Sequence, residues 1–335
     1  MAGASTAALA AAVSDAGALG GFGGTDASPD ELRQVIRAIR AQTSRPFIVN
    51  LYLDRADPYV SDAAHETALK TALAPAHAEL TAGEVPDPVD LFGKFDSQVA
   101  VAIEERVPVL SSHFGPPDAA VMRALKAIGT CVIATATTVD EARMLESAGI
   151  AAIIAQGSEA GGHRGTFGSP AGHALIGTMA LVPQIVDAVS VPVIAAGGIM
   201  DGRGILAALA LGAAAAQLGT AFLLCDEAGT DAGMRRAVAA AGDTSTMVTR
   251  AFTGRAARGI RNRFIEEWGA REPAPFPLQH LLTVDIRAAA RKAGHPELVN
   301  LWAGQGVARA RAVPAGELVA ALVAELAAAR RGLDD

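Results

Sequence analysis

The chain has 335 residues, of which 51% are hydrophobic and 19% charged, so a large core can be buried and global disorder is excluded. Its formal net charge is −7 at pH 7, and no basic cluster occurs apart from the arginines between 250 and 263. Because nucleic-acid binding requires clustered Lys and Arg side chains that neutralise phosphates, we expect no nucleic-acid partner.

Three further features favour a cytoplasmic protein. Cys131 and Cys225 lie in apolar runs, without the spacing of metal ligands, as expected for core thiols in a reducing compartment. The N-terminal segment contains Asp15 and no basic residue before Arg33, unlike a signal peptide. The longest apolar stretch, 205–225, is interrupted by glycines and a glutamine, so we expect no membrane-spanning helix. Because no metal-ligand spacing is present, we also expect no bound metal.

Apolar strand-like runs alternate with helix-like segments over the first two hundred residues. The clearest helix start is Ser28-Pro29-Asp30-Glu31, which combines an N-cap, a proline at the first helical position and acidic first-turn residues. In chain order we predict a helix at 5–16, a strand at 18–22, a helix at 28–42, a strand at 46–53, a helix at 95–106, a strand at 107–112, a helix from 117, a strand at 130–135, a helix at 139–148, a strand at 151–155, a helix at 176–189, a strand at 192–196, a helix at 202–211 and a strand at 214–218.

The strands are continuously apolar, which is typical of a parallel sheet covered on both faces. Repeated βα units form either a doubly wound sheet or a (β/α)8 barrel, and we predict the α/β TIM barrel over residues 1–225. The chain opens almost directly on a helix, so the first strand is expected to be truncated to residues 1–3. Residues 54–90 break the pattern and are predicted as an insertion with a helical middle. Residues 226–335 are predicted as a mostly helical segment that packs on the barrel mouth and ends in a helix at 315–331.

The segment 156–165 (QGSEAGGHRG) places a histidine behind two glycines at the end of a predicted strand. The carboxyl ends of parallel strands are where α/β enzymes place reactive groups, and the glycines allow the backbone to approach a flat ligand. Histidine titrates nearest neutrality, so His163 is the candidate for proton transfer. The alternative is a glycine-rich surface loop with an incidental histidine. Glu159 either pairs with Arg164 or orients the loop backbone.

Two glycine signals lie one βα unit apart, after the predicted strands 192–196 and 214–218. They are Gly197-Gly198 and the segment Gln217-Leu218-Gly219-Thr220. In a barrel, the loops after strands seven and eight bind phosphate through backbone N–H groups, and Thr220 adds a hydroxyl donor. The alternative is that both segments are tight turns only.

Two polar residues lie in or at the end of other predicted strands. Asn50 interrupts the apolar run at 46–53, where an amide is costly unless it is paired. It is either a satisfied core amide or a ligand contact. His113 ends the strand at 107–112 on the same side of the sheet, and we predict that it lines the substrate pocket.

Taken together, these segments resemble the nitronate monooxygenases, formerly called 2-nitropropane dioxygenases, a family of FMN-binding (β/α)8 barrels. The resemblance extends over Met1-Ala2-Gly3 and the segments 46–51, 111–115, 156–165, 195–198, 217–220, 249–264 (TRAFTGRAARGIRNRF) and 301–306 (LWAGQG). In the family a strand precedes the segment that corresponds to Met1-Ala2-Gly3.

The resemblance also implies roles for individual residues. His163 would act as the base for a nitroalkane or hold the nitronate beside the flavin. The phosphate of FMN would be bound by Gly197, Gly198, Gly219 and Thr220. The rest of the cofactor would contact Asn50, Gln156, Gly161, Gln217 and Gln305. The implied reaction converts an alkyl nitronate, such as propionate 3-nitronate, and O2 to a carbonyl compound and nitrite.

Other functions on the same fold remain open at the level of the sequence. A flavin-dependent NADH enoyl-(acyl-carrier-protein) reductase has a similar Gly-Gly-His loop, and an NADH:quinone reductase is a further relative. The segments RNRF and LWAGQG favour the oxygenase. A flavin-binding barrel without turnover and a phosphate-binding barrel for another ligand are the non-flavoenzyme alternatives. A homodimer is possible.

Overall fold

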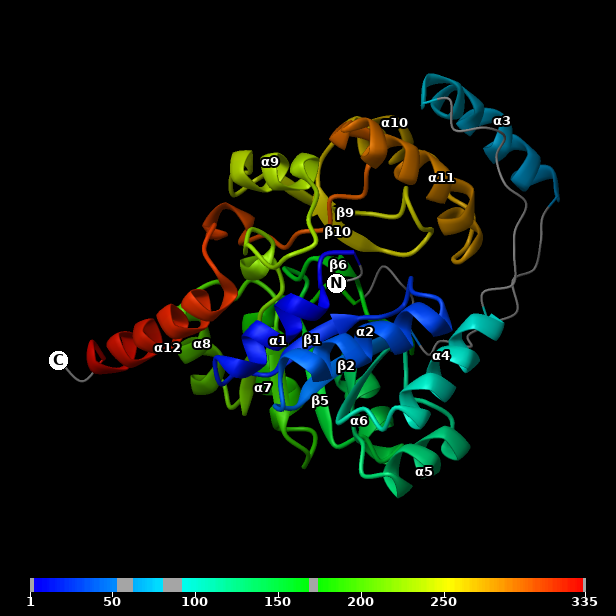
Figure 1. Ribbon diagram of the computed structural model, residues 1–335. Helices are drawn as coiled ribbons and strands as arrows, with labels where there is room; N and C mark the ends of the chain where they lie inside the picture. The colour runs from blue at the N-terminus through cyan, green and yellow to red at the C-terminus, as the bar shows by residue number, and fades with distance from the viewer. Residues whose placement is uncertain (1–2, 53–62, 81–91, 169–173, 334–335) are drawn as a thin grey trace.

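The computed structural model describes residues 3–52, 63–80, 92–168 and 174–333. Seven parallel strands form one curled sheet in the order β1-β2-β3-β4-β5-β7-β8 (Figure 1). Their bounds are β1 Gly20–Gly23, β2 Phe47–Tyr52, β3 Val109–His113, β4 Cys131–Ala136, β5 Ala152–Gln156, β7 Val193–Ala196 and β8 Ala215–Gln217. The predicted parallel α/β sheet is confirmed, and each of its strands overlaps a predicted one.

Alternation along the strands separates the two faces of the sheet. In β2, Phe47, Val49 and Leu51 are buried in the main hydrophobic core against the helices. The intervening Ile48 packs instead with a small apolar cluster that includes Ile133 and Ile154. Because side chains alternate along a strand, Asn50 and Tyr52 share the face of Ile48, inside the curl of the sheet.

Helices that alternate with the strands along the chain cover the outer face of the sheet (Figure 1). They are α1 Ala7–Asp15, α2 Pro29–Gln42, α4 Phe92–Glu104, α5 Ala119–Ala127, α6 Val139–Ser147, α7 Thr178–Val186 and α8 Gly202–Ala210. The predicted start of α2 is confirmed, since Ser28 and Glu31 form a reciprocal capping box.

A second group of elements lies beside the carboxyl ends of the strands (Figure 1). A three-stranded antiparallel sheet joins β6 (Gly162–His163), β10 (Ala257–Ile260) and β9 (Thr246–Thr249). Around it lie α9 (Ala232–Ala240), α10 (Arg263–Trp268), α11 (Leu278–Ala293) and the 3-10 turns η1 (Thr220–Phe222), η2 (Pro296–Leu298) and η3 (Val307–Arg309). The segment after 225 therefore contributes two strands besides its predicted helices.

Helix α3 (Ala63–Leu80) is the described part of the predicted insertion at 54–90, and the rest of that insertion lies outside the described residues. Its apolar residues Leu69 and Leu73 share a hydrophobic core with α10 and α11, and Glu79 forms an ion pair with Arg263 at 2.7 Å. Helix α3 thus packs against the C-terminal elements.

The last helix, α12 (Ala315–Arg331), has the predicted bounds and lies against α8 and α1. Strands β1 and β8 are the two ends of the sheet, and α1 precedes β1 while α8 precedes β8. Leu318, Val319 and Leu322 of α12 pack with Leu9 and Val13 of α1 in one buried cluster. Helix α12 therefore connects the helices at the two open ends of the sheet. The domain boundary at 225 stays a prediction.

Candidate active site

The imidazole of His163 has a hydrogen-bond partner at each ring nitrogen. Its strand β6 pairs with β10, with His163 opposite Ala257. Nδ1 lies 3.2 Å from the hydroxyl of Tyr52, the last residue of β2, and Nε2 lies 2.9 Å from the hydroxyl of Thr253. The parallel sheet and the segment before β10 thus meet at this ring.

The loop that carries His163 is fixed by Gln156 and Arg164. The side-chain amide of Gln156 donates to the backbone carbonyl of His163 at 2.9 Å and accepts from the Gly165 N–H at 2.8 Å. Arg164 is buried, and this burial lowers the pKa of its guanidinium to about 10. Its N–H groups donate to the backbone carbonyls of Gln156, Gly157 and Ala174 at 2.9, 2.6 and 2.8 Å. Both polar side chains therefore hold the loop in shape.

The environment of His163 favours its neutral form. Burial and, after it, the nearby His113, His280, Arg255 and Arg287 hold the pKa of His163 well below its usual range. The ring is therefore uncharged near neutral pH and can accept a proton only at an energetic cost.

His113 supports this arrangement from the end of β3. Its Nε2 lies 3.2 Å from the His163 carbonyl, which can only accept, so Nε2 carries the proton. Its Nδ1 then accepts from the Thr135 hydroxyl at 3.2 Å. Burial is the main cause that lowers the pKa of His113 to about 3.

Aromatic rings surround both histidines. The ring of Tyr52 stacks on His113 at 5.3 Å between centroids and meets the edge of Phe114 at 4.7 Å. The ring centroids of Trp302 and Phe276 lie 5.5 and 6.3 Å from that of His163. The ring of Phe114, whose φ of 71° is unusual for a large side chain, also carries the Arg255 guanidinium at 3.8 Å.

Asn50 lies on the inner face of β2, two residues before Tyr52. Its Nδ2 donates to the backbone carbonyl and the hydroxyl of Ser111 at 3.2 and 3.1 Å. Its amide group is thus paired on the nitrogen side, and its Oδ1 makes no hydrogen bond to a described residue. This leaves one acceptor of Asn50 available to a ligand.

The two glycine signals lie side by side, because Ala196 of β7 pairs with Gln217 of β8. Gly197 and Gly198 have φ angles of 121° and 71°, which glycine adopts without strain. No hydrogen bond among the described residues uses the backbone N–H groups of Gly198, Gly219 or Thr220. Unpaired N–H groups gathered at strand ends suit an anion such as a phosphate.

The loop 301–306 closes against these segments. Gly304 N–H donates to the Thr220 hydroxyl at 2.9 Å, and Gln305 N–H donates to the Glu159 carbonyl at 2.9 Å. A Cβ on Gly161 would lie 2.6 Å from the Ala303 carbonyl carbon and the Gly304 nitrogen, so only glycine fits there. Gln217 and Gln305 are exposed, and within the described residues neither side chain is hydrogen-bonded to His163.

Glu159 orients a loop backbone, which is one of its two predicted roles. Its carboxylate accepts from the Thr178 N–H at 2.9 Å and from the Thr178 hydroxyl at 2.8 Å. It thereby connects the His163 loop to the first turn of α7.

Sequence reasoning assigned no role to Tyr52 or Thr253, the two partners of the His163 ring. Tyr52 reads as one more apolar residue of a strand, and Thr253 lies about ninety positions from His163 in the chain. The alternation along 46–53 was the available signal, since it puts Tyr52 on the face of Asn50.

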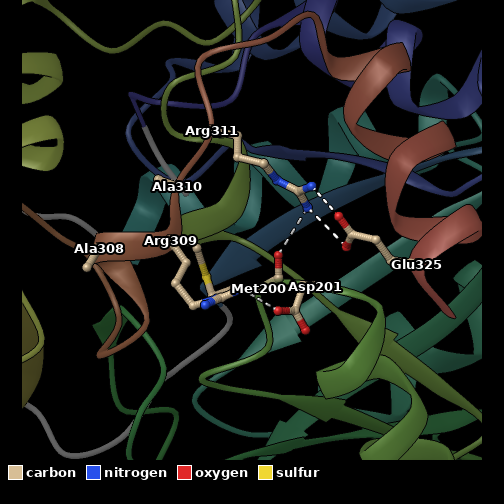
Figure 2. A pocket seen from close by; sticks show the side chains of 7 residues that line it. All are labelled: Met200, Asp201, Ala308, Arg309, Ala310, Arg311 and Glu325. Atoms are coloured by element: carbon tan, nitrogen blue, oxygen red, sulfur yellow. Dashed lines mark hydrogen bonds and ion pairs between the residues drawn. The ribbon is translucent and has the colours of Figure 1, made fainter. Parts of the chain in front are cut away.

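A separate pocket of about 330 Å³ lies where the loop after β7 meets the segment after 306 (Figure 2). Arg309 pairs with Asp201 at 2.6 Å and Arg311 with Glu325 at 2.5 Å. Since its charged side chains neutralise each other, this pocket joins segments of the chain and differs in character from the site around His163.

The described residues contain neither a metal-binding cluster nor a membrane-spanning helix. No group of three or more His, Cys, Asp and Glu side chains there is arranged to hold a metal ion. No described helix combines the length and the apolar composition needed to cross a bilayer.

Comparison with known proteins shows the family of the chain. Residues 1–325 match the profile described as nitronate monooxygenase. A nitronate monooxygenase of Pseudomonas aeruginosa is 43% identical over 97% of this chain and 94% of its own length, and a probable nitronate monooxygenase of Staphylococcus aureus is 41% identical over 97% and 92%.

Solved structures agree with this relationship. A nitroalkane oxidase from Streptomyces ansochromogenes superposes with a TM-score of 0.92 at 45% identity, covering 99% of this chain and 95% of its own. FabK from Thermotoga maritima superposes with a TM-score of 0.76 at 32% identity, covering 100% and 93%. The chain belongs to the nitronate monooxygenase family.

Proposed function

We propose that the protein uses FMN to oxidise alkyl nitronates, such as propionate 3-nitronate, with O2 to a carbonyl compound and nitrite. One observation carries the proposal. In a member of this family, a neutral histidine held on two sides lies at the same end of the sheet as paired glycine loops with unused N–H groups.

In this proposal the phosphate of FMN is held by the loops after β7 and β8. The backbone N–H groups of Gly198, Gly219 and Thr220 have no partner among the described residues, and Thr220, whose hydroxyl accepts from Gly304, still has its own proton to donate. The ring and ribityl chain would contact the five remaining predicted residues, Asn50, Gln156, Gly161, Gln217 and Gln305. Of these, Asn50 has an acceptor to offer, and Gly161 permits close approach of the backbone.

When bound, the flavin supplies electron transfer between the nitronate and O2. The chain's own residues provide position and electrostatics. Neutral His163 contacts the nitronate or takes a proton from the nitroalkane, and the aromatic rings around it exclude water. The positively charged Arg255, which lies over Phe114, favours an anion in this region.

The test is turnover by purified, FMN-loaded protein in air. We expect propionate 3-nitronate to give nitrite together with O2 consumption. Replacing His163 by Gln is expected to lower kcat/KM about a hundredfold, whereas His295→Gln, an exposed histidine, leaves it unchanged. Equal rates for the two variants would remove His163 from the mechanism.

The NADH-dependent reductases on the same fold are separated by a second arm of this experiment. Anaerobic NADH is expected to bleach the bound flavin slowly. Fast bleaching by NADH without nitrite formation from the nitronate would assign the protein to the reductases. A cytoplasmic location and a homodimer stay predictions from the sequence.

A further inference from the structure

Only one tautomer of His163 satisfies all the contacts around its ring. The Thr253 hydroxyl lies 2.9 Å from Nε2 and 3.3 Å from the backbone carbonyl of Arg255. A carbonyl oxygen can only accept, so the single hydroxyl proton of Thr253 points to it. The Thr253 oxygen then accepts from His163, and Nε2 carries the ring proton.

Nδ1 of His163 is consequently the nitrogen with the lone pair, and the Tyr52 hydroxyl lies 3.2 Å from it. The opposite tautomer would require Thr253 to donate its hydroxyl proton to Nε2. The hydrogen bond from Thr253 to the Arg255 carbonyl would then be lost, because the hydroxyl has only one proton. Tyr52 therefore donates to Nδ1. Its own proton is held firmly, because burial raises the pKa of this phenol.

This arrangement leaves His163 without a free lone pair. A neutral nitroalkane must transfer its Cα proton to a base, which becomes positively charged while the substrate becomes the nitronate anion. Here Nε2 is protonated and Nδ1 is occupied, and the charged ring is also disfavoured by burial and by His113, His280, Arg255 and Arg287. A substrate that arrives as the nitronate needs no such transfer.

We propose that Tyr52 is a positioning residue that, together with Thr253, holds His163 as the Nε2–H tautomer with Nδ1 occupied, so that the site selects the ionised nitronate over the neutral nitroalkane. The inference rests on the proposed function, because it takes His163 as the group that meets the substrate. In this role, His163 presents its ring as a fixed neutral group and does not act as a base.

The tautomer is tested directly on the FMN-loaded protein with 15N-labelled histidine, using His163→Gln to assign the signals. Long-range 1H–15N spectra are expected to show His163 protonated at Nε2, with Nδ1 accepting a hydrogen bond. In Tyr52→Phe, which keeps the ring stacked on His113, the Nδ1 resonance is expected to shift to that of an unbonded nitrogen. A proton on Nδ1 in the unaltered protein would overturn the proposal, whatever the enzyme's activity.

Selectivity is tested by the ratio of kcat/KM for a neutral nitroalkane to kcat/KM for its nitronate at one pH. Tyr52→Phe frees Nδ1 as a base, so we expect this ratio to rise about tenfold or more. Thr253→Val removes the acceptor of the Nε2 proton and is expected to raise this ratio of kcat/KM values as well. Thr249→Val, a buried threonine in β9 whose hydroxyl accepts from Ala251 N–H, is the matched control and leaves it unchanged.

An unchanged ratio in both Tyr52→Phe and Thr253→Val would overturn the proposed selectivity. Absence of nitronate oxidation in the unaltered protein would overturn the proposed function and this selectivity with it. The spectra would then still decide the tautomer, so the two failures are distinguishable.

Discussion

Protonation of His113 would break a hydrogen bond that the folded protein needs. Its Nδ1 accepts from Thr135, and the protonated ring would lose that acceptor inside the core. The pKa is about 3 in the folded state against an ordinary 6.5. The folded protein therefore stabilises the neutral form of His113.

We predict that this histidine makes the protein less stable in mild acid. Well above pH 6.5 the imidazole is neutral in both states, and as the pH falls through 6.5 the unfolded chain takes up a proton that the folded protein does not bind until about pH 3. Between pH 8 and pH 5 this amounts to about 2 kcal/mol. Urea unfolding at a series of pH values measures it. His113→Gln, which does not titrate, should show a shallower fall, and an identical fall in both proteins would contradict the prediction.

At the scale of elements, Asp201 connects the start of α8 to the segment that follows the loop 301–306. Its carboxylate accepts from the N–H groups of Arg203 and Gly204 and pairs with Arg309 at 2.6 Å (Figure 2). The hydrogen bond from Arg203, followed by the backbone bond and both arginine charges, lowers the pKa of Asp201 from 3.8 to about 2.

Two substitutions separate the cap from the charge. Asp201→Ala removes both and is expected to destabilise the protein by about 1–2 kcal/mol, whereas Asp201→Asn keeps a capping oxygen and should lose about 0.5 kcal/mol. The charged form is favoured above pH 3.8, and its contribution is lost as the pH falls towards 2. Thermal unfolding at pH 7 and in acid measures both effects. Equal losses in the two variants would show that the cap contributes nothing.

The parallel strands and their helices were predictable because each is a local pattern. The run 151–155 is apolar on both faces, and the capping residues of α2 are adjacent in the chain. Strands β9 and β10 were missed because β10 buries Arg258, whose Nε donates to the Ser158 carbonyl at 2.8 Å. A charged residue satisfied by a distant loop leaves no local signal for a strand.

The same distinction applies to the site. The residues His163, Gly197 and Gly198 follow strands, and their place at one end of the sheet follows from the parallel topology. The pairing of His163 with Thr253 depends on the antiparallel contact of β6 with β10, about ninety residues apart in the chain. Partners of this kind are fixed by tertiary structure, so the sequence indicated the reactive group and not what holds it.

At the scale of the whole molecule, α12 packs against α1 and α8, the helices that precede the two end strands of the sheet. We predict that Leu318→Ala, at a fully buried position between α12 and its neighbours, destabilises the protein by about 2–5 kcal/mol. Val323→Ala, on the exposed side of the same helix, should change the stability by less than about 0.5 kcal/mol. Denaturant unfolding compares them, and equal midpoints would show that the packing of α12 on α1 and α8 does not contribute to stability.

The position of α12 also sets an order of events during synthesis. Strands β1 to β8 have all been synthesised by residue 217, whereas helix α12 is complete only at residue 331. More than a hundred residues therefore emerge while Leu9 and Val13 have no α12 to pack against. These apolar side chains of α1 therefore stay without their native partner until α12 has been made and has packed, and protection of the new chain from aggregation depends on how soon the last helix docks.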